Sequence, residues 1–267
     1  MWAEIGVGAV AAVALIAYAV LAGADFGGGV WDAFAHGPRK DAQREAIAHA
    51  MGPVWEANHV WLIFVVVLLF SGFPVAYATL GIALFVPFHL VLLGIILRGA
   101  AFVFRAYSPQ SARRTGPGRG GRRWGAVFGA ASTVTPVLLG MCLGAVSAGG
   151  IRVAADGTVT AAGAWTGALP VAMGAFALAI CAYLAAVYLA NETAGALRDD
   201  FRRRALWAGT GVVALSVLVL PLLRVRAPHL WSGLLSPRAA PVVAVGAVAA
   251  LLSGWALLRR RFRTARI

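Results

Sequence analysis

The sequence is poor in charged residues and above all in acids. Only 12% of its residues are charged and only ten of 267 are Asp or Glu, whereas about a quarter of the residues in a soluble domain are charged. In contrast, 61% are hydrophobic and the mean hydropathy is +0.82. These values exclude an ordinary soluble domain and indicate an integral membrane protein. Since no stretch is long and polar enough to form a separate soluble domain, we expect residues 1–267 to form a single membrane domain.

Motifs typical of soluble enzymes are also absent. The sequence has no phosphate loop, no HExxH and no CxxC pair, and its two cysteines, Cys142 and Cys181, lie inside apolar runs. We therefore predict neither a disulfide framework nor a metal site. The net charge is +13, but the basic residues lie mainly between apolar runs, where they contact lipid headgroups. This distribution indicates membrane lipids as partners and argues against nucleic acid.

Long uncharged runs predict about seven transmembrane helices in an all-α bundle. Ile5–Ala24 has the ~20 residues that one span needs. Val60–Leu97 has 38, about 57 Å as one helix, so we expect two spans with a reversal between residues 71 and 81. The connector of residues 36–50 is charged and is expected to lie in water. The remaining spans are expected within Trp124–Ile151, Gly157–Asn191, Ala205–Leu223 and Ala239–Leu258.

The basic residues predict the orientation of the bundle. With seven helices, 18 of the 23 Lys and Arg residues fall in connectors and a tail on one side, and four fall on the other. Arg98 remains inside a span. Because cytoplasmic loops carry an excess of basic residues, we predict an N-terminus outside and a C-terminus in the cytoplasm.

Polar residues cluster at one depth of the predicted bundle. The stretch WEANHVW places Glu56, Asn58 and His59 at the cytoplasmic start of the second helix, and the topology brings Asp25 and Arg98 to a similar level. One interpretation is that Arg98 neutralises the carboxylates and fixes helix packing. The other is a proton path from the cytoplasm through Asp25, Glu56 and His59, because intramembrane acids and imidazoles often relay protons. Spacing alone leaves both open.

Two histidines lie within the predicted spans, and paired histidines on neighbouring helices could hold a b-type haem. His59 begins the second helix, whereas His89 lies near the middle of the third. The different depths argue against a shared haem.

Four motifs, in this order, resemble the second subunit of cytochrome bd-type quinol oxidases. They are GADFGGG at 23–29, WEANHVW at 55–61, LRGAAFVFR at 97–105 and ETAGALR at 192–198. The resemblance implies a heterodimer in the bacterial cell membrane that oxidises quinol and reduces oxygen to water. The haems would reside in subunit I, so that this chain binds none, although some members hold a structural quinone in this subunit.

The resemblance also implies roles for individual residues. Acids at the positions of Asp25 and Glu56 are associated with cytoplasmic proton delivery, and Trp55 and Asn58 are motif residues that would support the path. Glu56 stands where Asp is more usual, and His59 where Gln or Glu is expected. Ala22 replaces a further acid.

The family usually continues for one or two further helices, so the resemblance predicts a short form. The alternative functions are a proton-coupled transporter, a b-type cytochrome using His59 and His89, and an assembly or scaffold protein.

Overall fold

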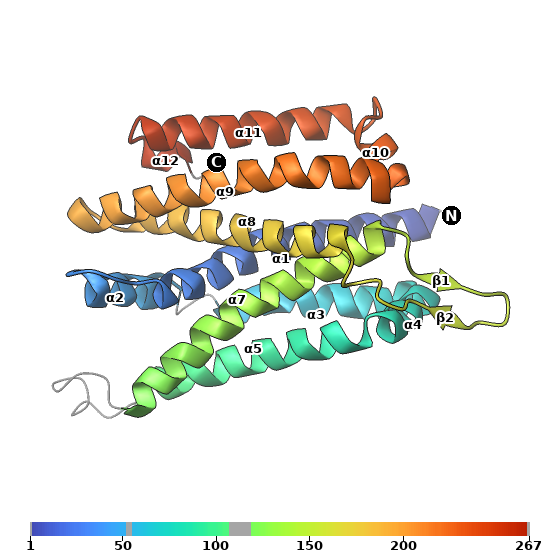
Figure 1. Cartoon of the computed structure of the whole chain (residues 1–267), viewed down its shortest axis with the longest axis horizontal. Coiled ribbons are helices and arrows are strands. Elements are labelled where there is room, and N and C mark those ends of the chain that lie inside the picture. The colour runs from blue at the N-terminus through green and yellow to red at the C-terminus, as the bar shows by residue number, and fades with distance from the viewer. Residues whose placement is uncertain (1, 52–54, 107–118, 266–267) are drawn as a thin grey trace.

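The computed structural model describes residues 2–51, 55–106 and 119–265 and shows helices packed side by side along a common direction (Figure 1). Within these residues, six helices are long and apolar enough to cross a membrane, and a bent pair, α3 with α4, brings the number to as many as seven. The predicted all-α membrane bundle is confirmed. The long helices are α1 (Trp2–Ala33), α3 (Trp55–Gly72), α5 (Phe85–Ala106), α7 (Arg119–Ser147), α8 (Ala168–Glu192), α9 (Gly195–Arg226) and α11 (Ala240–Leu258).

The long apolar run reverses where the sequence predicts. α3 ends at Gly72, and the short helix α4 (Pro74–Ala83) is bent by 118° relative to it before α5 begins at Phe85. Pro74 occupies the first turn of α4, where the missing N–H of proline costs no helical hydrogen bond. The break therefore divides 38 uncharged residues into two helices, as expected, but the extra helix α4 is not predicted by run length.

The uncharged run 157–191 is helical only in its second part. α8 begins at Ala168, and before it β1 (Arg152–Val153) pairs antiparallel with β2 (Val159–Thr160). Gly157 has a φ of 84° between the two strands, a conformation that glycine adopts without steric cost. The 25 residues of α8 already suffice for a membrane crossing, so the start of the run is not needed for the span.

The connector between α1 and α3 is partly buried. It contains α2 (Lys40–Met51), whose Ile47 and Met51 pack in one apolar cluster with Leu189 of α8 and Phe201 of α9. The expectation that this connector lies in water is thus wrong for one face of α2. Gln43, Ile47 and Met51 recur at intervals of four and therefore share one face of α2. That face is buried.

The two ends of the bundle differ in composition. Figure 1 shows α2, the junction of α8 with α9, and α12 (Phe262–Ala265) at one end, and α4, β1, β2 and α10 (Pro228–Leu234) at the other. The connectors of the first end carry most of the basic residues of the sequence. This segregation agrees with the predicted topology, and the direction in which the bundle faces the cytoplasm stays a prediction.

Helix α1 approaches its neighbours closely through glycine. A Cβ atom on Gly27 would collide with the carbonyl of Cys181 on α8, and one on Gly29 would collide with the side chain of Ser132 on α7. Small residues permit such contacts between membrane helices. The second half of α1 is consequently enclosed by α3, α7 and α8, and this is where Asp25 and Asp32 lie.

Candidate functional site

A buried ion pair joins α1 to α5. Arg98 Nη2 lies 2.7 Å from Asp25 Oδ1 and 3.1 Å from the Asp25 carbonyl oxygen, and Arg98 Nε donates to Ser132 Oγ at 3.0 Å. Asp25 is 1% exposed and Arg98 3%. A charge at such a position is costly unless it is paired, so each residue depends on the other. This pairing is one of the two interpretations that the sequence leaves open, and the structure brings both residues together.

A second ion pair lies about two helical turns nearer the end of the same helices. Arg105 donates two hydrogen bonds to the carboxylate of Asp32, at 2.9 and 3.1 Å. Asp32 and Asp25 are seven residues apart on α1, as are Arg105 and Arg98 on α5, so the parallel helices carry two matched pairs. The face shared by Asp25 and Asp32 is visible in the sequence, but the identity of the partner Arg105 is not predicted. The equal spacing of seven on both helices is the signal that could have found it.

Aromatic rings enclose the guanidinium groups of both pairs. The Cζ atom of Arg98 lies 5.2 Å from the ring centroid of Phe26 and 5.0 Å from that of Phe128, and Arg105 lies 5.2 Å from Phe128. Such cation–π contacts favour a desolvated arginine. Phe128 therefore forms a common wall between the inner and the outer pair.

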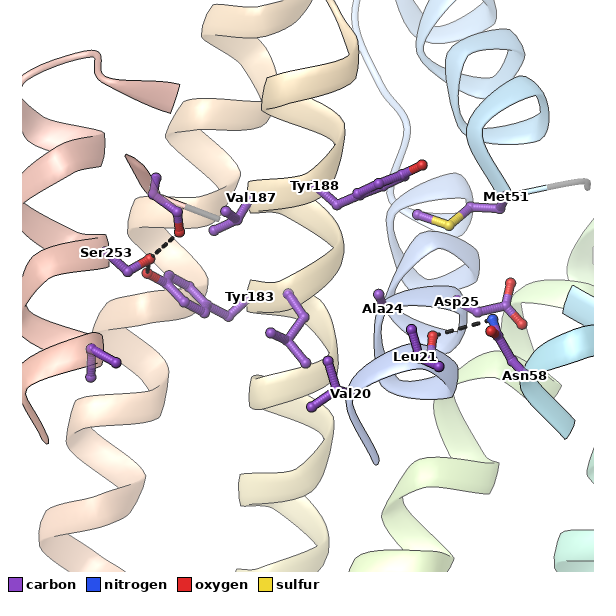
Figure 2. A pocket seen from close by; sticks show the side chains of 14 residues that line it. Val20, Leu21, Ala24, Asp25, Met51, Asn58, Tyr183, Val187, Tyr188 and Ser253 are labelled. Carbon is purple, nitrogen blue, oxygen red and sulfur yellow. Dashed lines mark hydrogen bonds between the residues drawn. The ribbon is translucent and has the colours of Figure 1, made fainter. Parts of the chain in front are cut away.

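Arg98 bonds only one of the two carboxylate oxygens of Asp25. Among the described residues, Asp25 Oδ2 is buried and has no hydrogen-bond partner. Asp25 also lines a cavity of about 450 Å³ between α1, α8 and α11. The polar residues around this cavity, drawn in Figure 2, are Asp25, Asn58, Tyr183, Tyr188 and Ser253.

Asn58 connects α3 to α1 beside this carboxylate. Its Nδ2 donates to the carbonyl oxygen of Leu21 at 3.3 Å, and its side chain lies next to Asp25 (Figure 2). On the opposite side of the cavity, Tyr183 Oη lies 2.6 Å from Ser253 Oγ, which donates to the Ala265 carbonyl. Polar groups thus occur at both sides of a cavity whose walls are otherwise mainly apolar.

The motif residues Trp55 and Glu56 are assigned only in part. Their backbone belongs to the first turn of α3, but their side chains lie outside the described part of the structure. The predicted roles of both residues stay predictions. Because Glu56 precedes His59 by three positions, helical geometry places the two on one face of α3.

The two intramembrane histidines occupy different surroundings. His59 is partly buried and meets the rings of Tyr18 and Phe26 edge-on, with centroids 6.1 and 5.9 Å apart. His89 is exposed, and its Nδ1 donates to the Phe85 carbonyl of its own helix at 2.7 Å. His59 contacts Phe26, the residue after Asp25, and so lies near the level of the Asp25–Arg98 pair. His89 precedes Arg98 by nine residues, about 13 Å along α5. The expectation that the two histidines lie at different depths therefore agrees with the structure. The described residues contain no group of three or more His, Cys, Asp or Glu side chains that could hold a metal ion.

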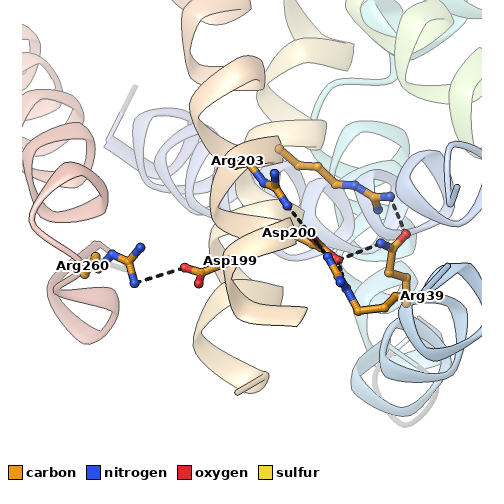
Figure 3. Close-up of polar contacts among 7 residues, drawn as sticks. Arg39, Asp199, Asp200, Arg203 and Arg260 are labelled. Carbon is orange, nitrogen blue, oxygen red and sulfur yellow. Dashed lines mark hydrogen bonds and ion pairs between the residues drawn. The ribbon is translucent and has the colours of Figure 1, made fainter. Parts of the chain in front are cut away.

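Sequence reasoning missed a third carboxylate site, centred on Asp200 of α9. Its two oxygens accept hydrogen bonds from Arg39 at 2.7 and 2.8 Å, from Gln43 at 3.0 Å and from Arg203 at 2.7 Å (Figure 3). Gln43 Oε1 in turn accepts from Arg204 at 2.7 Å. Hydrogen bonding to Asp200 raises the pKa of Arg39 above its usual range.

The Asp200 cluster reaches further into the end of α1. Arg204 donates to the carbonyl oxygens of Trp31 and Phe34 at 3.3 Å, satisfying groups that the end of a helix leaves without a partner. The cluster therefore ties α2, α9 and α1 together. In sequence, Asp200 looks like one of several charges at a helix start. Its partners Gln43, in α2, and Arg39, just before α2, are 157 and 161 residues away.

Comparison with known proteins gives one family. The sequence model described as "Cytochrome bd terminal oxidase subunit II" matches residues 4–267. A solved structure, the bd oxidase from Geobacillus thermodenitrificans, superposes with a TM-score of 0.81 at 22% identity and covers 100% of this chain and 79% of that chain. At this identity, the likeness concerns the fold.

Individual relatives match over parts of their length. The putative cytochrome bd menaquinol oxidase subunit II of Bacillus subtilis (strain 168) is 27% identical over 244 residues, 87% of this chain and 67% of the relative. Cytochrome bd ubiquinol oxidase subunit 2 of the same strain is 37% identical over 94 residues, and cytochrome bd-I ubiquinol oxidase subunit 2 of Escherichia coli (strain K12) is 31% identical over 132 residues. These two matches span 27% and 32% of the relatives and 35% and 49% of this chain.

Proposed function

The chain belongs to the family of cytochrome bd terminal oxidase subunit II, and from this premise we propose that it is the haem-free second subunit of a bd-type quinol:oxygen oxidoreductase. Its partner in a heterodimer is a haem-bearing subunit I in the bacterial cytoplasmic membrane. This chain supports assembly of the complex and delivers cytoplasmic protons for the reduction of oxygen to water. Quinol reaches the complex through the partner, so the isolated chain is not catalytic.

The buried carboxylate of Asp25 carries the proton-delivery proposal. Arg98 holds Oδ1, while Oδ2 is buried with no hydrogen-bond partner in the described chain and belongs to a residue that lines the cavity. A carboxylate fixed by one oxygen is oriented, and its second oxygen is open to accept and release a proton. Intramembrane acids that border a cavity commonly serve proton relays.

The neighbouring residues complete the proposed path. Glu56, on the first turn of α3, takes up the proton and His59 lies on the same helical face, while Trp55 and Asn58 support the arrangement. Asn58 is suited to this role because its hydrogen bond to the Leu21 carbonyl ties α3 to the turn of α1 that precedes Asp25.

The surroundings of the histidines and of the cavity suggest which cofactors this chain would hold. His59 and His89 differ in depth and surroundings, so they do not fit a bis-histidine haem, and we place the haems in subunit I. The mainly apolar walls of the cavity beside Asp25 suit the carbon skeleton of a structural quinone. The residues 1–267 are proposed to act as one membrane domain.

Turnover of charge-neutral variants tests the proton path. In the complex purified from membranes, Asp25→Asn retains an acceptor for Arg98 but removes the titrating group. We expect normal haem content in the partner and quinol-dependent oxygen uptake reduced by about 100-fold, the contribution of a typical acid–base group. Glu56→Ala is expected to give a similar, assembled but slow enzyme. Asp200→Asn is the matched control and should retain full uptake.

Two outcomes would contradict different parts of the proposal. Full turnover of assembled Asp25→Asn and Glu56→Ala would exclude the proton path but leave the subunit role intact. Failure of the chain to copurify with a haem-bearing subunit, together with proton-coupled transport by the chain alone in liposomes, would instead favour the transporter.

A further inference from the structure

A second cavity, rich in arginine, lies at the end of the bundle that carries most of the basic residues. Its volume is about 510 Å³. It is found where α8 ends, α9 begins and the chain leaves α11 for α12. The residues that line it are Asn191, Arg198, Arg260, Arg261, Phe262 and Thr264. No carboxylate is among these lining residues.

Two of its arginines are held in place by contacts that leave their charge unneutralised. Arg198 Nε donates to the Thr193 carbonyl at 2.7 Å, and its guanidinium lies 5.0 Å from the ring centroid of Phe262. Arg261 lies 5.4 Å from the ring of Trp255. Within the described part of the chain, neither Arg198 nor Arg261 forms an ion pair. The carbonyl and the two rings therefore orient two cations beside an open space.

The third arginine is only weakly neutralised. Arg260 Nη1 lies 3.4 Å from Asp199 Oδ1, and both side chains are largely solvent-exposed (Figure 3). An exposed pair at this distance contributes little. The other acid nearby is Glu192, which accepts a hydrogen bond from Asn191 at 3.3 Å. Three arginines thus face the cavity with two acids beside it, and the site keeps a positive excess.

The position of the cavity indicates the ligand. α11 is an apolar candidate span, and the cavity begins directly after its last turn, with Trp255 and Phe262 close by. Aromatic residues gather at the level of lipid headgroups, and arginines that follow a membrane helix attract anionic lipids. Guanidinium groups also match phosphate oxygens geometrically. We propose that this cavity binds the phosphate of an anionic phospholipid headgroup, with Arg198, Arg260 and Arg261 as its ligands.

Lipid retention by charge-neutral variants tests the proposal. The protein is purified from membranes with any subunit that accompanies it, and bound lipid is measured by native mass spectrometry after addition of phosphatidylglycerol or phosphatidylcholine. Removing two cations by Arg260→Gln with Arg261→Gln should weaken phosphatidylglycerol binding at least about tenfold, since each basic residue near a membrane surface contributes roughly fivefold. Both side chains are exposed, so the fold is expected to be retained, and the thermal unfolding midpoint without added lipid checks this.

The matched control lies at the opposite end of the bundle. Arg224→Gln with Arg226→Gln, in the last turn of α9, removes the same charge and should change phosphatidylglycerol binding less than twofold. Equal losses in the two double variants would overturn the proposal, as would equal binding of phosphatidylglycerol and phosphatidylcholine. Displacement of the lipid by millimolar inorganic phosphate would identify a free-phosphate site and contradict the lipid assignment.

Discussion

Two carboxylates, Asp25 and Asp200, are both paired with arginine but are satisfied to different degrees. Asp25 shares one oxygen with Arg98 deep in the bundle, and its other oxygen has no partner among the residues that the structure describes. Asp200 lies at the end of the bundle and accepts from three side chains through both oxygens. A fully bonded carboxylate has no oxygen left for proton transfer, whereas a half-bonded one does. The comparison therefore separates a structural acid from a candidate functional one.

Solvent exposure widens the difference. The side chain of Arg98 is 4% exposed, whereas those of Arg39 and Arg203 are 45% and 66% exposed. If Asp200 is lost, water hydrates both of its arginines, but if Asp25 is lost, Arg98 stays buried without its counter-charge. Loss of one partner should accordingly cost far more at Asp25 than at Asp200.

The largest effect is expected from breaking the inner pair. Arg98→Ala leaves the Asp25 carboxylate buried and unpaired, and we expect the free energy of unfolding to fall by ~3–5 kcal/mol. Chemical denaturation of the purified complex measures this loss.

A double variant separates the stability of the inner pair from its function. Asp25→Leu with Arg98→Met replaces the pair by apolar groups and should recover most of the lost stability, while oxygen uptake stays low because no carboxylate remains. Recovery of uptake together with stability would show that the pair only fixes helix packing.

A smaller effect is expected from Asp200→Ala. Arg39 and Arg203 become hydrated, but buried Gln43 loses an acceptor for its Nε2. We expect a loss of ~1–3 kcal/mol in the free energy of unfolding, measured by the same denaturation experiment, and unchanged quinol-dependent oxygen uptake. A fall in uptake without a fall in stability would mean that Asp200, too, takes part in proton delivery.

The sequence predicts the features that depend on local properties of the chain, such as the length of an uncharged, apolar run. Run length alone places α11 within one residue of the expected Ala239–Leu258, because a membrane span must be apolar and of fixed length. The short α4 and the β1–β2 hairpin are not found this way. Both lie at an end of the bundle, where the lengths that a crossing requires no longer constrain the backbone.

The sequence identifies those residues of the candidate site whose charge is energetically costly to place in or beside an apolar run. Asp25 and Arg98 are conspicuous because they are charged residues within or beside apolar runs, and topology brings them to one level. Asp200 occurs among Arg198, Arg202 and Arg203, where a carboxylate is unremarkable in sequence. Its distant partners are Gln43 in α2 and Arg39 just before it, and only tertiary packing of Ile47 and Met51 brings that helix to α9.

The smallest effect is expected from the exposed side of the Asp200 cluster. Arg39→Gln removes one donor pair from a carboxylate that retains Gln43 and Arg203, and the guanidinium that is lost is 45% exposed. We expect a decrease in stability well below that of Asp200→Ala. The decrease should vanish as ionic strength rises to ~1 M, where the Debye length is about 3 Å. Arg203→Gln, at 66% exposure, serves as the matched comparison and should behave alike. Denaturation curves at low and high salt measure both variants, and a salt-independent loss at Arg39 would show that its ion pair is shielded from solvent like the pair of Asp25 with Arg98.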